Sequence, residues 1–131
     1  MFLKQIVVLL TGILLLQSCE KEPGVGGNSA IQGKVITHDY NASFTQLIGI
    51  YPAADQFVYI VFGNHAGYDK RIKTDYNGNF RFEFLYPGKY SIYTYSADTS
   101  GEVLSGKVAV IQNIELPKNK TFTMPDLIVY D

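Results

Sequence analysis

The side chain with the clearest chemical potential is the thiol of Cys19, the only cysteine among the 131 residues. It directly follows Leu16-Gln17-Ser18, at the end of an apolar run that begins at Ile6 and is preceded by the basic Lys4. A charged start, an apolar stretch of about ten residues and a small residue before the cut are typical of a secretory signal peptide, and so short a stretch does not span a bilayer as a helix. The sequence therefore predicts a signal peptide over residues 1–18 and a mature chain that begins with Cys19.

The four residues from Leu16 to Cys19 resemble the lipobox of bacterial lipoproteins. That resemblance implies that the thiol of Cys19 carries lipid, that the signal peptide is removed, and that the new amino terminus is acylated with a fatty acid such as palmitate. Each buried methylene contributes about 0.8 kcal/mol, and two or more acyl chains hold a protein stably on a membrane. The alternatives are a secreted protein whose cysteine lies here by chance and a short membrane anchor that is never cut.

Residues 19–29 are polar and glycine-rich, which predicts a flexible tether without regular structure. The run Glu20-Lys21-Glu22 also resembles the export signal of surface lipoproteins in the Bacteroidetes lineage, although ordinary linker polarity explains it as well. We expect a lipid-anchored protein of the outer membrane, on its periplasmic or its cell-surface face.

Other reactive groups are sparse. His38 and His65 are the only two histidines, both in predicted loops, and a zinc or iron site would need further ligands at suitable spacing. The oxygen donors at residues 75, 77 and 79 alternate as in a calcium loop, but the closing position holds Tyr86 and not glutamate. No Gly-x-Ser-x-Gly motif positions a serine nucleophile. We therefore expect no catalytic centre, no metal and no cofactor.

The elements that would position any site are predicted to be strands. Removal of the signal peptide leaves about 113 residues with a net charge of about −2, which suits one domain and gives no basic stripe for nucleic acid. From Ala30 onward, apolar residues recur at spacing two or in short runs bounded by Gly, Pro, Asn and Asp, which predicts an all-β domain over residues 30–131. Seven segments fit this pattern: Ile31–Thr37, Gln56–Phe62, Lys70–Thr74, Asn79–Phe84, Lys89–Ser96, Ser105–Ile111 and Thr121–Tyr130.

The segment Asn79–Phe84 has the clearest alternation. Phe80, Phe82 and Phe84 are predicted to share a buried face, opposite the charged Arg81 and Glu83. Before it, Asn77-Gly78 predicts a tight hairpin turn.

Two other segments carry signs of a sheet edge. Lysine and arginine in Lys70–Thr74 predict an edge strand, and Pro125 predicts an edge or a bulge in the last segment.

The stretch from Lys73 to Tyr90 resembles the hallmark of the carboxypeptidase regulatory-like domains, a transthyretin-like group of β-sandwiches. The matching positions are Thr74, Asp75, Gly78, Phe80, Phe82, Leu85, Pro87, Gly88 and Tyr90, and Ile31–Val35 resembles the first strand of the family. The resemblance implies a seven-stranded Greek-key sandwich of the transthyretin (prealbumin) type with an accessory role that is not enzymatic. The departure is the segment His38–Asp55, predicted as an unusually long loop.

A binding surface is predicted from the same alternation. Tyr90 is expected to bury its ring and to bond backbone through its hydroxyl, which sends Tyr93 and Tyr95 to the outer face. With the loop residue Tyr68, these tyrosines could bind a protein partner or a sugar. The favoured prediction is an interaction or accessory module. The alternative is a small carbohydrate-binding lipoprotein, and a third hypothesis is a hydrolase or metal-dependent enzyme.

Overall fold

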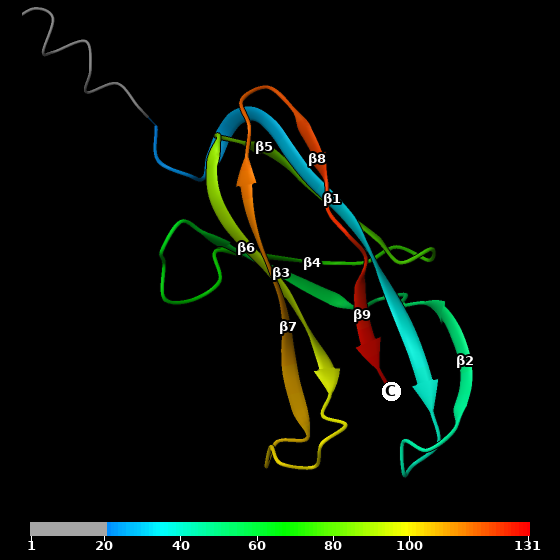
Figure 1. Cartoon of the computed structure of the whole chain (residues 1–131). Coiled ribbons are helices and arrows are strands. Elements are labelled where there is room, and N and C mark those ends of the chain that lie inside the picture. The colour runs from blue at the N-terminus through cyan, green and yellow to red at the C-terminus, as the bar shows by residue number, and fades with distance from the viewer. Residues whose placement is uncertain (1–20) are drawn as a thin grey trace, which may run out of the picture.

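The computed structural model describes residues 21–131, which form two packed β-sheets without a helix (Figure 1). The signal peptide and Cys19 lie outside the described residues. The nine strands are β1 (Val25–Tyr40), β2 (Leu47–Pro52), β3 (Phe57–Phe62), β4 (Lys70–Lys73), β5 (Asn79–Leu85), β6 (Gly88–Ala97), β7 (Lys107–Leu116), β8 (Thr121–Thr123) and β9 (Leu127–Tyr130). The expected all-β sandwich is thus present, with nine strands in place of seven.

The long strand β1 is the centre of the first sheet. It pairs antiparallel with β5 and β2, and parallel with β8 and β9. The second sheet has the order β4-β3-β6-β7, in which every neighbouring pair is antiparallel. The short, basic β4 lies at an edge of this sheet, as its lysines predict.

The core lies between the two sheets and is almost entirely apolar. Phe80, Phe82 and Tyr90 are 4%, 4% and 1% exposed, in agreement with their predicted burial. They pack with Ile31, Val35, Val58, Ile60, Leu85, Ile92, Ile114, Leu116, Met124, Leu127 and Val129. The Tyr90 hydroxyl accepts a hydrogen bond from the Gly24 amide at 2.9 Å and donates one to the Tyr86 carbonyl at 2.5 Å, so the expected backbone partner is present.

Phe84 departs from the predicted alternation. It is 65% exposed and has a φ of 57°, whereas the next residue, Leu85, is buried. Ser29 faces Leu85 and Ile31 faces Phe82, so β5 carries one residue more than β1 in this interval. This bulge turns Phe84 outward and brings Leu85 into the core.

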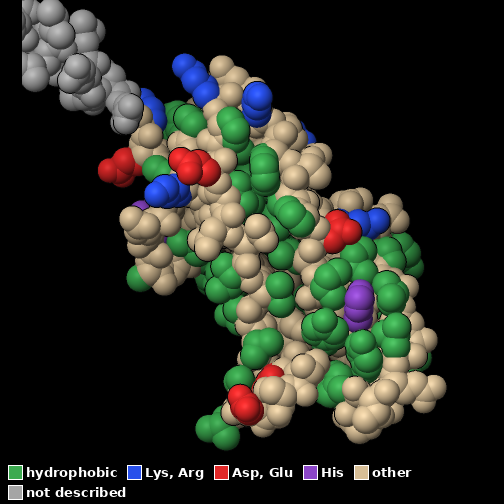
Figure 2. Space-filling view, in the orientation of Figure 1, with side chains coloured by type: hydrophobic (Ala, Val, Ile, Leu, Met, Phe, Trp, Pro, Cys, Tyr) green, Lys and Arg blue, Asp and Glu red, His purple; other side chains and the backbone are tan. Residues whose placement is uncertain are grey.

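The segment His38–Asp55 is not a loop. Its first residues continue β1 to Tyr40, and Leu47–Pro52 return as β2, with His38 directly opposite Ile50. His38 therefore lies in a strand, and its ring packs edge-on against Tyr130 with centroids 5.8 Å apart. The strand was missed because Ile48 and Ile50 are exposed, so no buried face marks it. Figure 2 shows hydrophobic side chains gathered on the surface at this end of the molecule.

The turn at Asp75–Gly78 forms, but it does not close a hairpin. Gly78 has a φ of 79° and its amide donates to the Asp75 carbonyl at 3.0 Å. The strands on either side separate, because β4 pairs with β3 in one sheet and β5 pairs with β1 in the other. The turn therefore carries the chain from one layer to the next.

The last segment carries the irregularity that Pro125 predicts. Ala30 faces Thr121 and Val35 faces Leu127, so the segment has one residue more than β1 between β8 and β9, as in a bulge. At the other end, residues 25–29 belong to β1 and not to the tether. Glycine permits this close approach, since a Cβ on Gly27 would lie 2.2 Å from the Leu85 carbonyl oxygen. Within residues 21–131, no helix is long and apolar enough to cross a membrane.

Candidate ligand-binding surface

The outer face of the second sheet carries a cluster of tyrosines. Along β6, Tyr90, Ile92 and Thr94 are buried, whereas Tyr93 is partly exposed and Tyr95 is 44% exposed. Because side chains alternate along a strand, Tyr93 and Tyr95 share the face that turns away from the core, as their spacing predicts.

Two further tyrosines complete the cluster. Tyr59 of β3 lies directly opposite Tyr93, and the two rings stack with centroids 4.9 Å apart and 9° between their planes. Tyr68, from the loop between β3 and β4, packs edge-on against Tyr59 with centroids 5.0 Å apart. The ring centroid of Tyr95 lies 5.6 Å from that of Tyr59 and 5.7 Å from that of Tyr93. These four residues, Tyr59, Tyr68, Tyr93 and Tyr95, are called the tyrosine face below.

The sequence pattern predicts Tyr68, Tyr93 and Tyr95 as binding residues but does not indicate Tyr59. The alternation in β3 places Val58 and Ile60 in the core, which already indicates that Tyr59 points outward. Its contact with Tyr93 depends on the register between β3 and β6, and no local pattern reveals that register.

Asp69 anchors the loop that carries Tyr68. Its amide donates to the Ile60 carbonyl at 2.8 Å, and its carboxylate accepts the Phe62 amide at 2.7 Å and contacts His65 Nδ1 at 2.8 Å. Burial raises the pKa of Asp69, but the Phe62 amide and His65 outweigh this effect and hold it below its ordinary value. His65 thus has a structural partner in this loop.

Basic residues flank the tyrosine face on the β4 side. The Arg71 guanidinium lies 4.4 Å from the centre of the Phe57 ring, and the Lys73 ammonium lies 5.0 Å from it. On the β7 side, Ile111 lies opposite Tyr93 and is 58% exposed. The cluster is therefore bordered by two cations on one side and an apolar residue on the other.

The chemistry of this surface is that of aromatic rings and neutral hydroxyls. Burial, followed by the neighbouring Tyr95 and Tyr59, raises the pKa of Tyr93 above its ordinary value, so its hydroxyl stays protonated near neutral pH. Each phenol can donate and accept a hydrogen bond. Because Tyr59 and Tyr93 cover each other's ring faces, a ligand would meet chiefly the exposed rings of Tyr68 and Tyr95.

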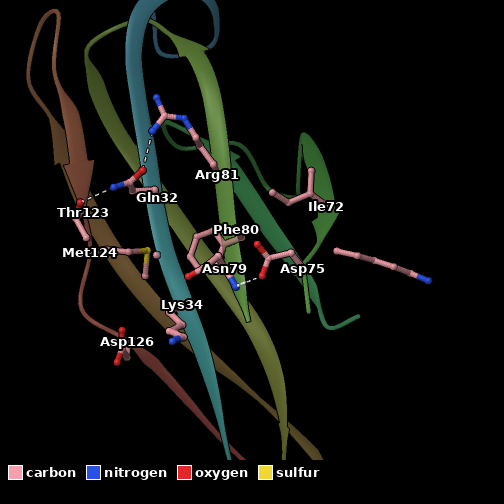
Figure 3. A pocket seen from close by; sticks show the side chains of 12 residues that line it. Gln32, Lys34, Ile72, Asp75, Asn79, Phe80, Arg81, Thr123, Met124 and Asp126 are labelled. Carbon is pink, nitrogen blue, oxygen red and sulfur yellow. Dashed lines mark hydrogen bonds between the residues drawn. The ribbon is translucent and has the colours of Figure 1, made fainter. Parts of the chain in front are cut away.

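A hollow of about 710 Å³, lined by residues of β1, β5 and the β8 segment and by Ile72 and Lys73 of β4, is a competing site (Figure 3). Three of its polar side chains bond to one another: Arg81 Nη1 donates to Gln32 Oε1 at 2.7 Å, and Gln32 Nε2 donates to Thr123 Oγ1 at 2.9 Å. Arg81 also pairs with Glu83 at 2.6 Å. This ladder ties β5, β1 and β8 together, whereas the charged side chains of Lys34, Lys73 and Asp126 also line the hollow and make no hydrogen bond or ion pair within residues 21–131.

The Asp75 carboxylate borders the same hollow and serves the turn. Its Oδ1 accepts the amide of Asn79 (Figure 3) and that of Asn77, each at 2.9 Å. This is turn chemistry of the kind that aspartate commonly supplies. Among residues 21–131, no three His, Cys, Asp or Glu side chains are grouped so that they could hold a metal ion.

No protein-family model and no curated protein sequence matches this chain. Among solved structures, the chain is similar to a candidate carbohydrate-binding protein from Pseudomonas aeruginosa, with 16% identity, a TM-score of 0.49, and coverage of 88% of this chain and 94% of that one. It is also similar to a minor pilin of the Gram-positive pathogen Streptococcus agalactiae, with 15% identity, a TM-score of 0.42, and coverage of 82% of this chain and 44% of the pilin. At such identities, the likeness concerns the arrangement of strands alone.

Proposed function

We propose that this protein is a binding module without enzymatic activity, anchored through lipid on Cys19 to the outer membrane, that recognises a partner through the tyrosine face. The observation that carries the proposal is the convergence of four tyrosines from β3, β6 and the β3–β4 loop on one outer sheet face. Tyrosine and arginine are enriched at protein interfaces, because they combine a large apolar area with hydrogen-bonding groups. Arg71 at the border adds to this composition.

The position of the amino-terminal segment supports such a role. Gly24, at the start of the described fold, is held by the Tyr90 hydroxyl and by the Tyr86 amide, which donates to its carbonyl at 2.8 Å. The chain therefore leaves towards Cys19 from the end of the domain where β5 and β6 meet (Figure 1). A lipid anchor on Cys19 would hold this end of the domain toward the membrane.

We also propose that this domain is related to the carboxypeptidase regulatory-like domains and shares their transthyretin-like Greek key. Thr74 and Tyr90, two of the matching residues, each hydrogen-bond the backbone of another segment through the side-chain hydroxyl. The Thr74 hydroxyl donates to the Ala53 carbonyl at 2.5 Å, and Tyr90 fixes Gly24 to Tyr86. The accessory role of those domains accords with a module that binds and does not catalyse.

Carbohydrate binding is the second candidate. The exposed rings of Tyr68 and Tyr95, at 49% and 44%, supply flat apolar surfaces beside several hydroxyls, a combination that suits the face of a sugar ring. A glycan should contact these two residues, and its binding should depend less on Arg71 than the binding of a protein partner would.

The test is capture of partners from the native membrane, together with a glycan array, using wild type and a Tyr93→Ala/Tyr95→Ala variant. The proposal predicts loss of the captured ligand in that variant and retention in Tyr76→Ala, which removes a tyrosine that is 91% exposed and lies outside the cluster. A glycan lost in the same way would select the second candidate. Binding or turnover that survives the double change and depends on His38, His65 or a metal would refute the proposal and favour an enzyme.

A further inference from the structure

The strand β7 presents a long free edge. It pairs with β6 over ten residues without a break in register, from Lys107 opposite Ala97 to Leu116 opposite Gly88. On its other side, no backbone hydrogen bond joins residues 108–116 to any other part of the described chain. An edge of this kind is a template for a further strand.

The two edges of the second sheet differ in how they are protected. β4 is four residues long and contains Lys70, Arg71 and Lys73, which discourage pairing with another chain. β7 is ten residues long, and its stretch from Val108 to Ile114 contains no charged residue. Charges occur only near its ends, as Lys107 and Glu115.

The order of side chains along β7 is complementary to itself. In an antiparallel pair of two β7 strands centred on Ile111, Lys107 of one copy lies opposite Glu115 of the other, and the same contact recurs at the opposite end. Both charged residues and Ile111 lie on the exposed face of the strand, so the two isoleucines meet at the centre. Opposite charges in facing positions stabilise a strand pair, whereas like charges destabilise it.

We propose that β7 is the site at which two copies of this chain associate, through antiparallel pairing centred on Ile111. The contact is isologous, as in most symmetric dimers. It joins the two second sheets into one sheet with the order β4-β3-β6-β7-β7-β6-β3-β4.

The pairing also has a consequence for the proposed ligand-binding surface. Directly opposed residues of an antiparallel pair lie on the same face of a sheet, so both tyrosine faces would lie on one side of the dimer. Three strand spacings, roughly 14 Å, separate the two β6 strands that carry Tyr93. A repetitive or dimeric ligand would then be held at two sites, with a gain in avidity. This last step depends on the proposed function, whereas the pairing itself does not.

A charge swap tests the pairing by analytical ultracentrifugation of the full chain over a range of concentrations. Lys107→Glu places like charges opposite each other at both ends, so the dimer Kd should rise about tenfold or more. Lys107→Glu/Glu115→Lys restores opposite charges and should return the Kd to near the wild-type value. A wild type that stays monomeric, or a dimer whose Kd does not respond to Lys107→Glu, would overturn the proposal.

Disulfide trapping in the Cys19→Ser chain fixes the register. Opposed residues of an antiparallel pair have Cα atoms about 4.5 to 5.5 Å apart, within the range that a disulfide spans. Ile111→Cys should therefore form a dimer on mild oxidation. Ala109→Cys should not form this dimer, because the cysteine at position 109 of the second copy would lie four residues away along the strands, roughly 13 Å. Ile50→Cys alters an isoleucine that is likewise 58% exposed, but on β2, and should also remain unlinked. Preferential trapping of Ile50→Cys would instead place the contact on the β1–β2 end and contradict the proposal.

Discussion

Tyr59 and Tyr93 stack almost in parallel across β3 and β6, with ring centroids 4.9 Å apart and 9° between the ring planes. The stack fixes both rings, because each restricts the rotation of the other while Tyr68 and Tyr95 pack against their edges. A surface that is ordered before binding loses little side-chain entropy when a ligand arrives. The proposed binding surface is therefore ordered before any ligand arrives.

The first prediction concerns the bulge in β5. Phe82→Ala should lower the free energy of unfolding by about 3–5 kcal/mol, because it removes a buried ring and leaves a cavity. Phe84→Ala, two residues away on an exposed position, should change it by no more than about 0.5 kcal/mol. Urea denaturation of both variants measures the difference. Equal losses would mean that the faces of β5 are assigned wrongly.

A second prediction concerns the attachment of the amino-terminal segment. Tyr90→Phe keeps the buried ring but removes the hydroxyl shared by Gly24 and Tyr86, so it should cost about 1–3 kcal/mol. Hydrogen exchange at the Gly24 amide should become faster, because that amide loses its acceptor. The control is Tyr76→Phe, whose ring is largely exposed. Unchanged exchange at Gly24 in Tyr90→Phe would contradict the role given to the hydroxyl.

Gly27 allows a third test. An alanine Cβ there would lie 2.2 Å from the Leu85 carbonyl oxygen and 2.7 Å from the Tyr86 Cα, and both are backbone atoms that cannot move alone. Gly27→Ala should therefore destabilise the fold by about 1–3 kcal/mol through overpacking. At Gly67 an added Cβ meets nothing within 4 Å, so Gly67→Ala serves as the control. If both variants melt at the wild-type temperature, β1 does not approach β5 as closely as described.

The alternation of side chains made part of this structure predictable. It placed Phe80, Phe82 and Tyr90 in the core and Tyr93 and Tyr95 outside, because period two follows directly from strand geometry. The outward turn of Phe84 could not be predicted in the same way, because the bulge depends on how β5 aligns with β1. β2 was missed for a related reason: its exposed apolar residues acquire strand structure by pairing with β1, and they show no buried side of their own.

The candidate site was predictable to a similar extent. Three of its four tyrosines were named from the sequence, and the fourth, Tyr59, joins them only through the register of β3 and β6. The anchoring of Tyr68 by Asp69 was equally hidden, because it depends on contacts with Ile60 and Phe62 on the preceding strand.

The fourth prediction concerns the anchor. Because Cys19 follows Leu16-Gln17-Ser18, Cys19→Ser should shift the protein from the membrane fraction to the soluble fraction. Mass spectrometry of the mature wild type should find lipid on Cys19 as the first residue. An unmodified Cys19 in the mature protein would remove the basis for membrane localisation.

We propose that the tyrosine face binds the ligand, and the affinity of a captured partner or glycan for matched variants tests this. Tyr93→Ala/Tyr95→Ala should weaken binding at least about tenfold, because it removes the exposed ring of Tyr95 and the ring of Tyr93 that orders Tyr59, and loss of a tyrosine at the centre of an interface commonly costs about 2 kcal/mol. The variant should remain folded by circular dichroism, and Tyr76→Ala should bind as the wild type does. Binding should also persist at high salt, since the contacts are mainly aromatic. Unchanged affinity in the folded double variant would show that the ligand binds elsewhere on the molecule.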